Sequence, residues 1–356
     1  MTIHIDGIFR LTRPLHVSAG AENVNGKNTN LTMTMPLVRQ NGVDQLPYFP
    51  GNDLRGRIRR FAARMVMSHL ASTGVKIPLS IFTGLMSGTA SASPDTASLT
   101  VEEAMRARYH LFMGVFGGGA RLLRSGFRVM DLIPILQVTI SAGMVPARMG
   151  EISDTTFTPK IRSEGVTVSL KPWQLLHKYN FLKVDDVYRV TNTTDIEHNL
   201  EDATQEIMAY QQQTIANKME RRKSKEEGSK DAPTKTDVGN MMTVQAIAAG
   251  TPMYYAMEMS DHLSDAQIGL LIYALQELIN EQALGGWVRS GLGKFTVDLT
   301  FTREGESFNL FNLEDREYVI APQAAHYVEA TKLALASIQL PELIEFYSPR
   351  KVKEAA

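Results

Sequence analysis

The residues best suited to binding a charged ligand lie in a turn that leads into an arginine-rich segment, residues 50–60 (PGNDLRGRIRR). Pro50 and Gly51 favour a tight turn, and Asn52 and Asp53 are residue types that accept hydrogen bonds from the first free amides of a helix. A helix N-terminus offers amides and a positive dipole end to an anion, and guanidinium groups can hold a phosphate bidentately. The segment is a candidate phosphate site, although a capped helix with a solvated basic face has the same pattern.

Side-chain spacing divides these arginines between faces of the predicted helix, residues 52–71. Apolar residues recur at the spacing of one buried face, at Leu54, Ile58, Phe61 and Met65. Arg55 and Arg59 lie one turn apart beside that face. The arginines of the other face are expected to meet solvent or another subunit: Arg57, Arg60 and Arg64.

Two glycine-rich segments follow later in the chain, at residues 116–119 (FGGG) and 285–295 (GGWVRSGLGKF). Glycines let backbone amides approach an anion, and basic or polar side chains stand in or after each segment. The second segment is not a Walker motif, because Phe295 follows its lysine where a serine or threonine would bind magnesium. The candidate phosphate contacts of these segments are Gly118, Arg121, Arg124, Arg289, Ser290 and Lys294.

Composition limits the ligands that the chain can bind. The 356 residues carry Lys+Arg 37 against Asp+Glu 38, a net charge of -1, so a polyanion site requires a local cluster of basic residues. With Cys 0, the chain has no disulfide or thiol chemistry. HxxxH, HExxH and EF-hand patterns are absent from the sequence, so we predict no metal and no cofactor. A signal peptide and a membrane-length apolar run are also absent, so we expect a cytoplasmic protein without membrane contact.

Residue patterns predict the elements that must position these side chains. Strands are predicted at 3–13, 127–140, 241–248, 252–259 and 295–301, with 127–140 as a central strand. Besides the helix at 52–71, helices are predicted from a capping box at Ser264 to Gly285 and at 324–337. The core order of strand, helix, strand, strand, helix, strand is the ferredoxin-like βαββαβ arrangement of RNA-recognition modules, an α+β fold. The aromatic motifs of those modules are missing, so base stacking on the sheet is not predicted.

We divide the chain into four parts on this basis. The palm core comprises 1–73, 111–184 and 244–302. A finger-like insertion of small and polar residues, outside the core, covers 74–110. The polar stretch 185–243 cannot bury enough apolar area to offset its ordering entropy, so it is predicted to be a partly flexible thumb insertion. A C-terminal extension with a helix covers 303–356.

Three motifs in this order resemble the signatures of the RAMP superfamily of CRISPR proteins. They are residues 50–59, residues 116–119 leading to 127–131 (FRVMD), and residues 285–295. Residues 242–253 (MTVQAIAAGTPM) are similar to the strand pair that follows the thumb in the backbone subunits of that superfamily. The resemblance covers residues 1–302 and is greatest with the type IV branch, with Asn52 and Asp53 where two serines are usual.

The resemblance implies a subunit that repeats head-to-tail along a CRISPR guide RNA as a helical filament. It would hold the RNA phosphates and display the bases for pairing with a target nucleic acid, beside other effector subunits. His16, after the first strand, is then a position on the RNA. The RNA contacts expected with it are Gly51, Asn52, Arg55, Arg59, Gly118, Arg121, Arg124, Arg289, Ser290 and Lys294. Whether the target is RNA or DNA stays open, because base pairing and not the subunit reads it.

One departure from the superfamily bears on catalysis. Relatives that cleave target RNA carry a loop aspartate before a segment that residues 33–39 (MTMPLVR) match, and Thr34 stands at the aspartate position. A threonine has no carboxylate, so we predict a scaffold without a catalytic residue. A shifted loop would leave Asp44 or Asp6 as a substitute.

Two alternative functions remain at this point. The first is a RAMP endoribonuclease that acts on guide precursor or target RNA with a histidine as general base, His16 before His110. The second is a ferredoxin-like oligomer that binds no RNA.

Overall fold

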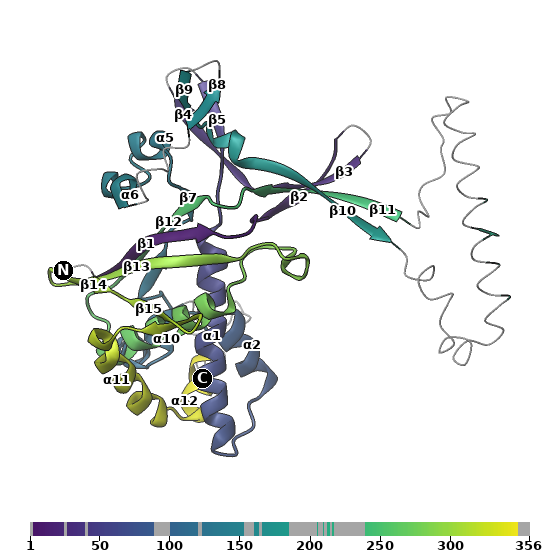
Figure 1. Ribbon diagram of the computed structural model, residues 1–356. Coiled ribbons are helices and arrows are strands. Elements are labelled where there is room, and N and C mark those ends of the chain that lie inside the picture. The colour runs from purple at the N-terminus through teal and green to yellow at the C-terminus, as the bar shows by residue number, and fades with distance from the viewer. Residues whose placement is uncertain are drawn as a thin grey trace, which may run out of the picture. The chain divides into compact units, whose positions relative to one another are not determined.

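The computed structural model describes residues 3–24, 27–39, 42–88, 100–119, 123–152, 160–163, 166–184 and 239–347, and the single residues 205, 209, 212, 213 and 216 (Figure 1). The chain divides into two compact units. The first holds Met1–Ala19, Thr32–His177 and Ala246–Ala356, and the second holds Gly20–Leu31 and Lys178–Gln245. Most of the predicted thumb and residues 89–99 of the predicted finger lie outside the described residues. None of the helices in the described ranges has the length and apolarity needed to cross a membrane.

The first unit is built on an antiparallel sheet with the strand order β14-β13-β1-β12-β6, in which β7 also pairs with β12. The strands are β1 (Ile3–Leu11), β6 (Phe127–Val129), β7 (Ile133–Pro134), β12 (Pro252–Met259), β13 (Phe295–Arg303) and β14 (Glu306–Asn309). Helix α1 (Gly51–Ser72) lies between β1 and β6 in the sequence, and α10 (Asp265–Glu281) lies between β12 and β13. Each helix therefore connects two parallel strands that have a third strand between them, which is the split βαβ pattern. This confirms the predicted α+β fold with a ferredoxin-like core.

Further elements complete the described chain. The helices are α2 (Leu79–Ser87), α3 (Val101–Tyr109), α4 (Met113–Phe116), α5 (Gln137–Ser141), α6 (Ala147–Ile152), α11 (Ala325–Ala336) and α12 (Leu340–Tyr347), with 3-10 turns η1 (Pro172–Leu175), η2 (Val288–Ser290) and η3 (Pro322–Ala324). Hairpins are formed by β4 (Thr34–Arg39) with β5 (Gly42–Pro47), β8 (Lys160–Ser163) with β9 (Val166–Ser169), and β15 (Phe311–Glu314) with β16 (Glu317–Ile320). Another sheet has the order β10-β11-β3-β2 and consists of β2 (Ser18–Val24), β3 (Lys27–Thr32), β10 (Leu176–Val184) and β11 (Gly239–Ile247).

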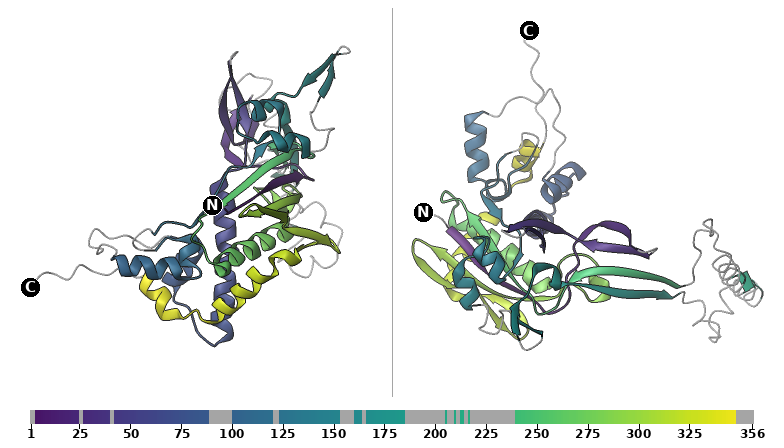
Figure 2. Two further views of the ribbon diagram at one scale, coloured as in Figure 1. Left: turned by 90° about the vertical axis from the view of Figure 1, so that its left-hand side faces the viewer. Right: turned by 90° about the horizontal axis from the view of Figure 1, so that it is seen from above.

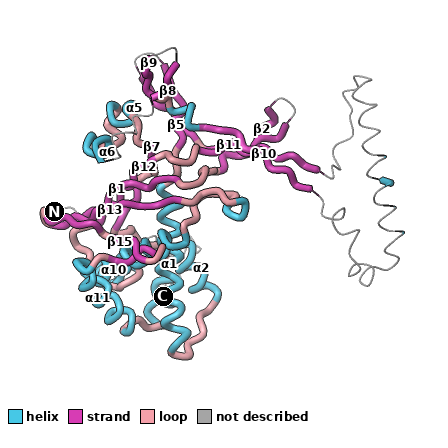
Figure 3. Tube along the Cα trace, viewed as in Figure 1, coloured by secondary structure: helices cyan, strands magenta, loops and turns pink. Residues whose placement is uncertain are grey.

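Alternation along β1 separates two apolar cores. Ile5 and Phe9 are buried in the main core, which contains the apolar faces of α1 and α10. Ile8, on the other face, is buried in a smaller core with Leu46 of β5 and Met149 of α6. Two further views and a tube drawing show α1 and α10 on one side of the sheet and α5 and α6 on the other (Figures 2 and 3). Apolar side chains therefore pack on the face where RNA-recognition modules stack bases.

The helix predictions hold at α10 and α11, and one strand prediction fails. The capping box at Ser264 is present, with its hydroxyl accepting from the Gln267 amide, and α11 matches the helix predicted at 324–337. Residues 127–140 do not form a central strand: they form β6 at the edge of the sheet, then β7 and α5. The run is apolar because it is buried, and Asp131 interrupts it to contact α1.

The end of α10 and the place of residues 74–110 also differ from the sequence predictions. Helix α10 ends at Glu281, before Gly285, and its C-cap Gln282 adopts the left-handed conformation at φ 47°. Gly285 instead allows a close approach of two backbone segments, because a Cβ there would lie 2.1 Å from the carbonyl oxygen of His16. The stretch 74–110 is not outside the core, since α2 contributes Ile81 and Leu85 and α3 contributes Ala107 to the main core.

Candidate nucleic-acid interface

An aspartate from the second motif caps the helix of the first motif. Helix α1 begins at Gly51 with Pro50 as its N-cap, and the Gly51 amide donates to Asp131 Oδ1 at 2.7 Å. A Cβ on Gly51 would lie 2.5 Å from a carbonyl oxygen of β6, so only glycine allows this approach. The Asp131 carboxylate thus stands at the positive end of the helix. This corrects the prediction that Asn52 or Asp53 caps α1 and that the Gly51 amide is open to a bound anion.

Arg59 is buried, with 6% of its surface exposed. Its guanidinium donates to Leu85 O at 2.7 Å, Gly84 O at 3.0 Å, Phe116 O at 3.2 Å, Gly117 O at 3.3 Å and Tyr347 OH at 3.0 Å. Burial lowers the pKa of Arg59, and Tyr347 partly opposes that shift. The side chain joins α1 to α2, to the end of α4 and to α12. Arg59 therefore has a structural role, and it also lines a hollow that Asn52, Arg55 and Arg124 share, so its role as a phosphate contact stays a prediction.

Asn52 and Arg55 line a groove of about 1130 Å³ in the first unit. Its other walls are α3, the start of α4, residues 123–129 and residues 258–262. The charged side chains of the lining are Arg55, Arg108, Arg124, Arg128, Glu258 and Asp261. A hollow of about 460 Å³ is also lined by Asn52, Arg55 and Arg124, together with Gly118. Predicted residues of the first and second motifs are therefore brought together at one positively charged groove.

The groove contains solvent-accessible polar and basic side chains as well as an ion pair. Asn52 and Arg124 are exposed and Arg55 is half-buried, whereas Arg128 Nε donates to Glu258 Oε2 at 2.7 Å. Burial lowers the pKa of His262, the nearby Arg108 lowers it further, and Asp261 partly opposes the shift. Arginines outnumber carboxylates in the lining, so the groove suits an extended polyanion better than a small neutral ligand.

Sequence reasoning missed three groove residues, Arg108, Arg128 and His262. Arg128 had a usable signal, because it lies between the buried Phe127 and the half-buried Val129 on a strand and must point outward. The other two carried no comparable signal. The predicted outer face of α1 is partly wrong as well: Arg57 donates to the Ala283 carbonyl, while Arg60 and Arg64 are exposed.

The third motif packs against the chain that follows β1. The Gly286 amide donates to His16 O at 2.9 Å, and the Gly293 amide donates to Pro14 O at 2.8 Å. His16 is only 1% exposed, and its Nδ1 lies 3.2 Å from Thr32 Oγ1. This corrects both predicted roles of His16, because a buried ring reaches neither an RNA backbone nor a scissile bond.

The remaining candidates of the third motif lie on the surface. Arg289, Ser290 and Lys294 are exposed, and they do not belong to the lining of the groove described above. They stay predictions as RNA contacts. Arg121 lies outside the described residues.

The β4–β5 hairpin determines what surrounds Thr34. Its hydroxyl donates to Gln45 Oε1 at 3.0 Å. Asp44 is paired opposite Leu37, an odd number of residues from Thr34, so it lies on the other face of the hairpin and forms an ion pair with Arg39 at 2.6 Å. Asp6 is buried on β1 and pairs with Arg148. Asp44 therefore does not share the face of Thr34, and Asp6 belongs to another strand. Across the described ranges, no three His, Asp or Glu side chains gather closely enough to hold a metal ion.

Comparisons of the chain with known proteins find similar solved structures. No protein-family model matches the chain. No curated protein matches it either. Among solved structures, the chain is similar to a chain of a structure titled "Type IV-B CRISPR Complex", with 12% sequence identity, a TM-score of 0.44, and coverage of 85% of this chain and 92% of that chain. At this identity and TM-score, we draw no conclusion about function from the match.

Proposed function

We propose that this chain is a non-catalytic backbone subunit of a CRISPR effector complex that binds guide RNA. The order of the three motifs supports this proposal, and so does the ferredoxin-like core. The observation that carries it is the groove, where Asn52 and Arg55 of the first motif meet Arg124 of the second. Side chains that are distant in the sequence supply a local positive charge that the net charge of -1 does not reveal.

The groove is suited to holding phosphates without reading bases. Guanidinium groups contact phosphate oxygens in any sequence, and pairing with the guide then selects the target. The sheet face that could stack bases is packed with the smaller apolar core. Copies arranged head-to-tail without closure would follow a linear guide as a helical filament, next to other effector subunits and the target nucleic acid.

Replacing groove arginines should weaken RNA binding without regard to sequence. We expect Arg55→Ala and Arg124→Ala each to raise Kd for single-stranded RNA about fivefold at 0.1 M salt and to reduce the salt slope by about 0.7 to 1, because each loses a phosphate contact. Fluorescence anisotropy with two labelled RNAs of unrelated sequence measures both quantities. Arg64→Ala, on the same helix but outside the groove, is the matched control and should keep the wild-type slope. An unchanged Kd and slope in both groove variants would remove the groove from the proposal.

The proposed scaffold should not cut RNA. We expect no cleavage of guide precursor, or of target RNA paired to the bound guide, under single-turnover conditions with and without Mg²⁺. The reason is that Thr34 has no carboxylate and Asp44 lies on the opposite face of its hairpin. Cleavage that also occurs in a mock purification, which lacks the protein, would come from a contaminating nuclease. Cleavage by the protein that disappears in Asp44→Ala would show that the protein is the alternative endoribonuclease.

A further inference from the structure

Helix α12 is held against α1 and α2 by a buried tyrosine. Tyr347 is 3% exposed, and its hydroxyl accepts a hydrogen bond from Arg59 Nη2 at 3.0 Å. A Cβ on Gly84 of α2 would lie 2.4 Å from the Tyr347 ring, so the missing side chain of this glycine makes room for the ring. Leu343 of the same helix is fully buried in the main core. Helix α12 is therefore part of the packed structure and not an appendage.

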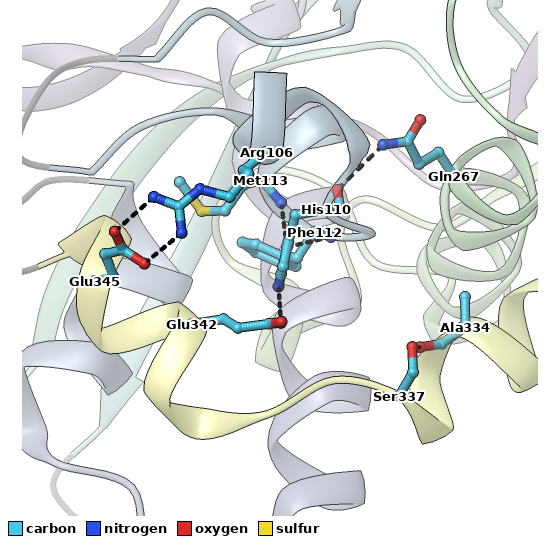
Figure 4. A network of polar contacts seen from close by, with 9 residues as sticks. All are labelled: Arg106, His110, Phe112, Met113, Gln267, Ala334, Ser337, Glu342 and Glu345. Carbon is cyan, nitrogen blue, oxygen red and sulfur yellow. Dashed lines mark hydrogen bonds and ion pairs between the residues drawn. The ribbon is translucent and has the colours of Figure 1, made fainter. Parts of the chain in front are cut away.

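The same helix is fastened to α3 by polar contacts (Figure 4). Glu345 accepts two hydrogen bonds from the guanidinium of Arg106, at 2.8 Å and 3.0 Å. One turn further on, the His110 ring meets the Phe346 ring edge-on at 5.4 Å, and its Nε2 lies 3.8 Å from Glu342 Oε2. Burial lowers the pKa of His110 to about 4, so the ring is neutral at pH 7 and its Nδ1 accepts from two backbone amides.

The helices that α12 contacts line the groove or the hollow beside it. Ser87 and Gly88, at the end of α2, line the hollow beside Arg55, and the Gly119 amide donates to Gly88 O at 3.2 Å. Ala107 and Arg108 of α3 line the groove itself. In contrast, no residue of α12 belongs to either lining. Helix α12 thus stands behind the groove, in contact with α1 and α3, which line the groove, and with α2, which lines the hollow.

We propose that α12 positions the walls of the groove for RNA, with Tyr347 and Glu345 as positioning residues. Tyr347 fixes α2 relative to α1 through Arg59, and Glu345 fixes α3 through Arg106. Together they hold Arg55 and Arg108 at the spacing that the bound phosphates require. This inference rests on the proposed function for its ligand, but the positioning itself can be measured without RNA.

A charge swap separates positioning from simple electrostatics. Glu345→Arg adds positive charge, which on its own would tighten RNA binding. Positioning predicts the reverse: about fivefold weaker binding, because Arg106 is then repelled. The double variant Arg106→Glu with Glu345→Arg restores the pair and the net charge, so it should recover the wild-type Kd. Tyr347→Phe keeps the ring but removes the acceptor, and should raise Kd with the salt slope unchanged, unlike Arg55→Ala.

Hydrogen exchange of the RNA-free protein completes the test. Amides of residues 79–88 and 101–109 should exchange faster in Glu345→Arg and return to wild-type rates in the swapped double variant. Folded variants with wild-type exchange and wild-type Kd would overturn the inference and leave the proposed function intact. Altered exchange in a protein that binds no RNA would instead uphold the positioning and refute the RNA assignment.

Discussion

Arg59→Met should lower the free energy of unfolding by about 3–5 kcal/mol or prevent folding of the first unit. The guanidinium supplies donors to four carbonyls and a hydroxyl in a site where only 6% of the residue is exposed. Methionine fills much of the volume but donates nothing, so these acceptors lose their partners without gaining water. Thermal and urea unfolding measure the loss.

Two variants make this prediction specific. Arg60→Met, at an exposed position of the same helix, should change stability by less than about 0.5 kcal/mol. Arg59→Lys keeps the charge, but an ammonium group cannot reach acceptors on several sides, so it should recover only part of the loss. A stable Arg59→Met protein that loses RNA binding would instead support Arg59 as a phosphate contact.

Gly51→Ala should cost about 2–4 kcal/mol of stability, which is a large effect for one methyl group. The added Cβ would lie 2.5 Å from one carbonyl oxygen and 2.8 Å from the Met130 carbonyl group, and backbone atoms cannot rotate away as a flexible side chain can. The helix start would have to move, which would also stretch the hydrogen bond from the Gly51 amide to Asp131. Chemical denaturation measures the change.

Gly56→Ala on the same helix is the matched control, with an effect of opposite sign. Its Cβ would meet only the end of the Arg60 side chain, at 3.4 Å. Alanine in a helix interior is favoured over glycine by about 0.5–1 kcal/mol, so this variant should be slightly more stable than the wild type. Equal stability of the two alanine variants would mean that the contact between the first and second motifs is loose.

Local patterns were sufficient to predict the order of the core elements. Alternation in β1 and the capping box at Ser264 are properties of neighbouring residues, and each led to the right element. The apolar run 127–140 failed because periodicity records burial and not conformation. Asp131 turns out of that run toward the amide of Gly51, a partner that local spacing cannot identify.

Local spacing is also insufficient to assign the roles of single residues at the candidate site. Arg55 and Arg59 are both arginines of α1 and lie one turn apart. Arg55 nevertheless lines the groove, whereas Arg59 is buried. The difference comes from Gly84, Gly117 and Tyr347, which approach Arg59 from remote parts of the chain. The burial of His16 also depends on a remote segment, because the third motif that contacts it begins far along the sequence. Motif order predicted which segments would come together, as residues 50–59 and Arg124 do at the groove, and only tertiary contacts show which side chains are exposed there.

The bond between Arg59 and Tyr347 has a consequence for protein synthesis. The two residues are separated by 288 positions, so at about 5–20 residues per second a ribosome makes the second roughly 15 to 60 s after the first. Until then, the guanidinium lacks one of its acceptors and α2 lacks the ring that packs on Gly84. A nascent chain therefore completes these contacts among α1, α2 and α12 only after residue 347 has left the ribosome.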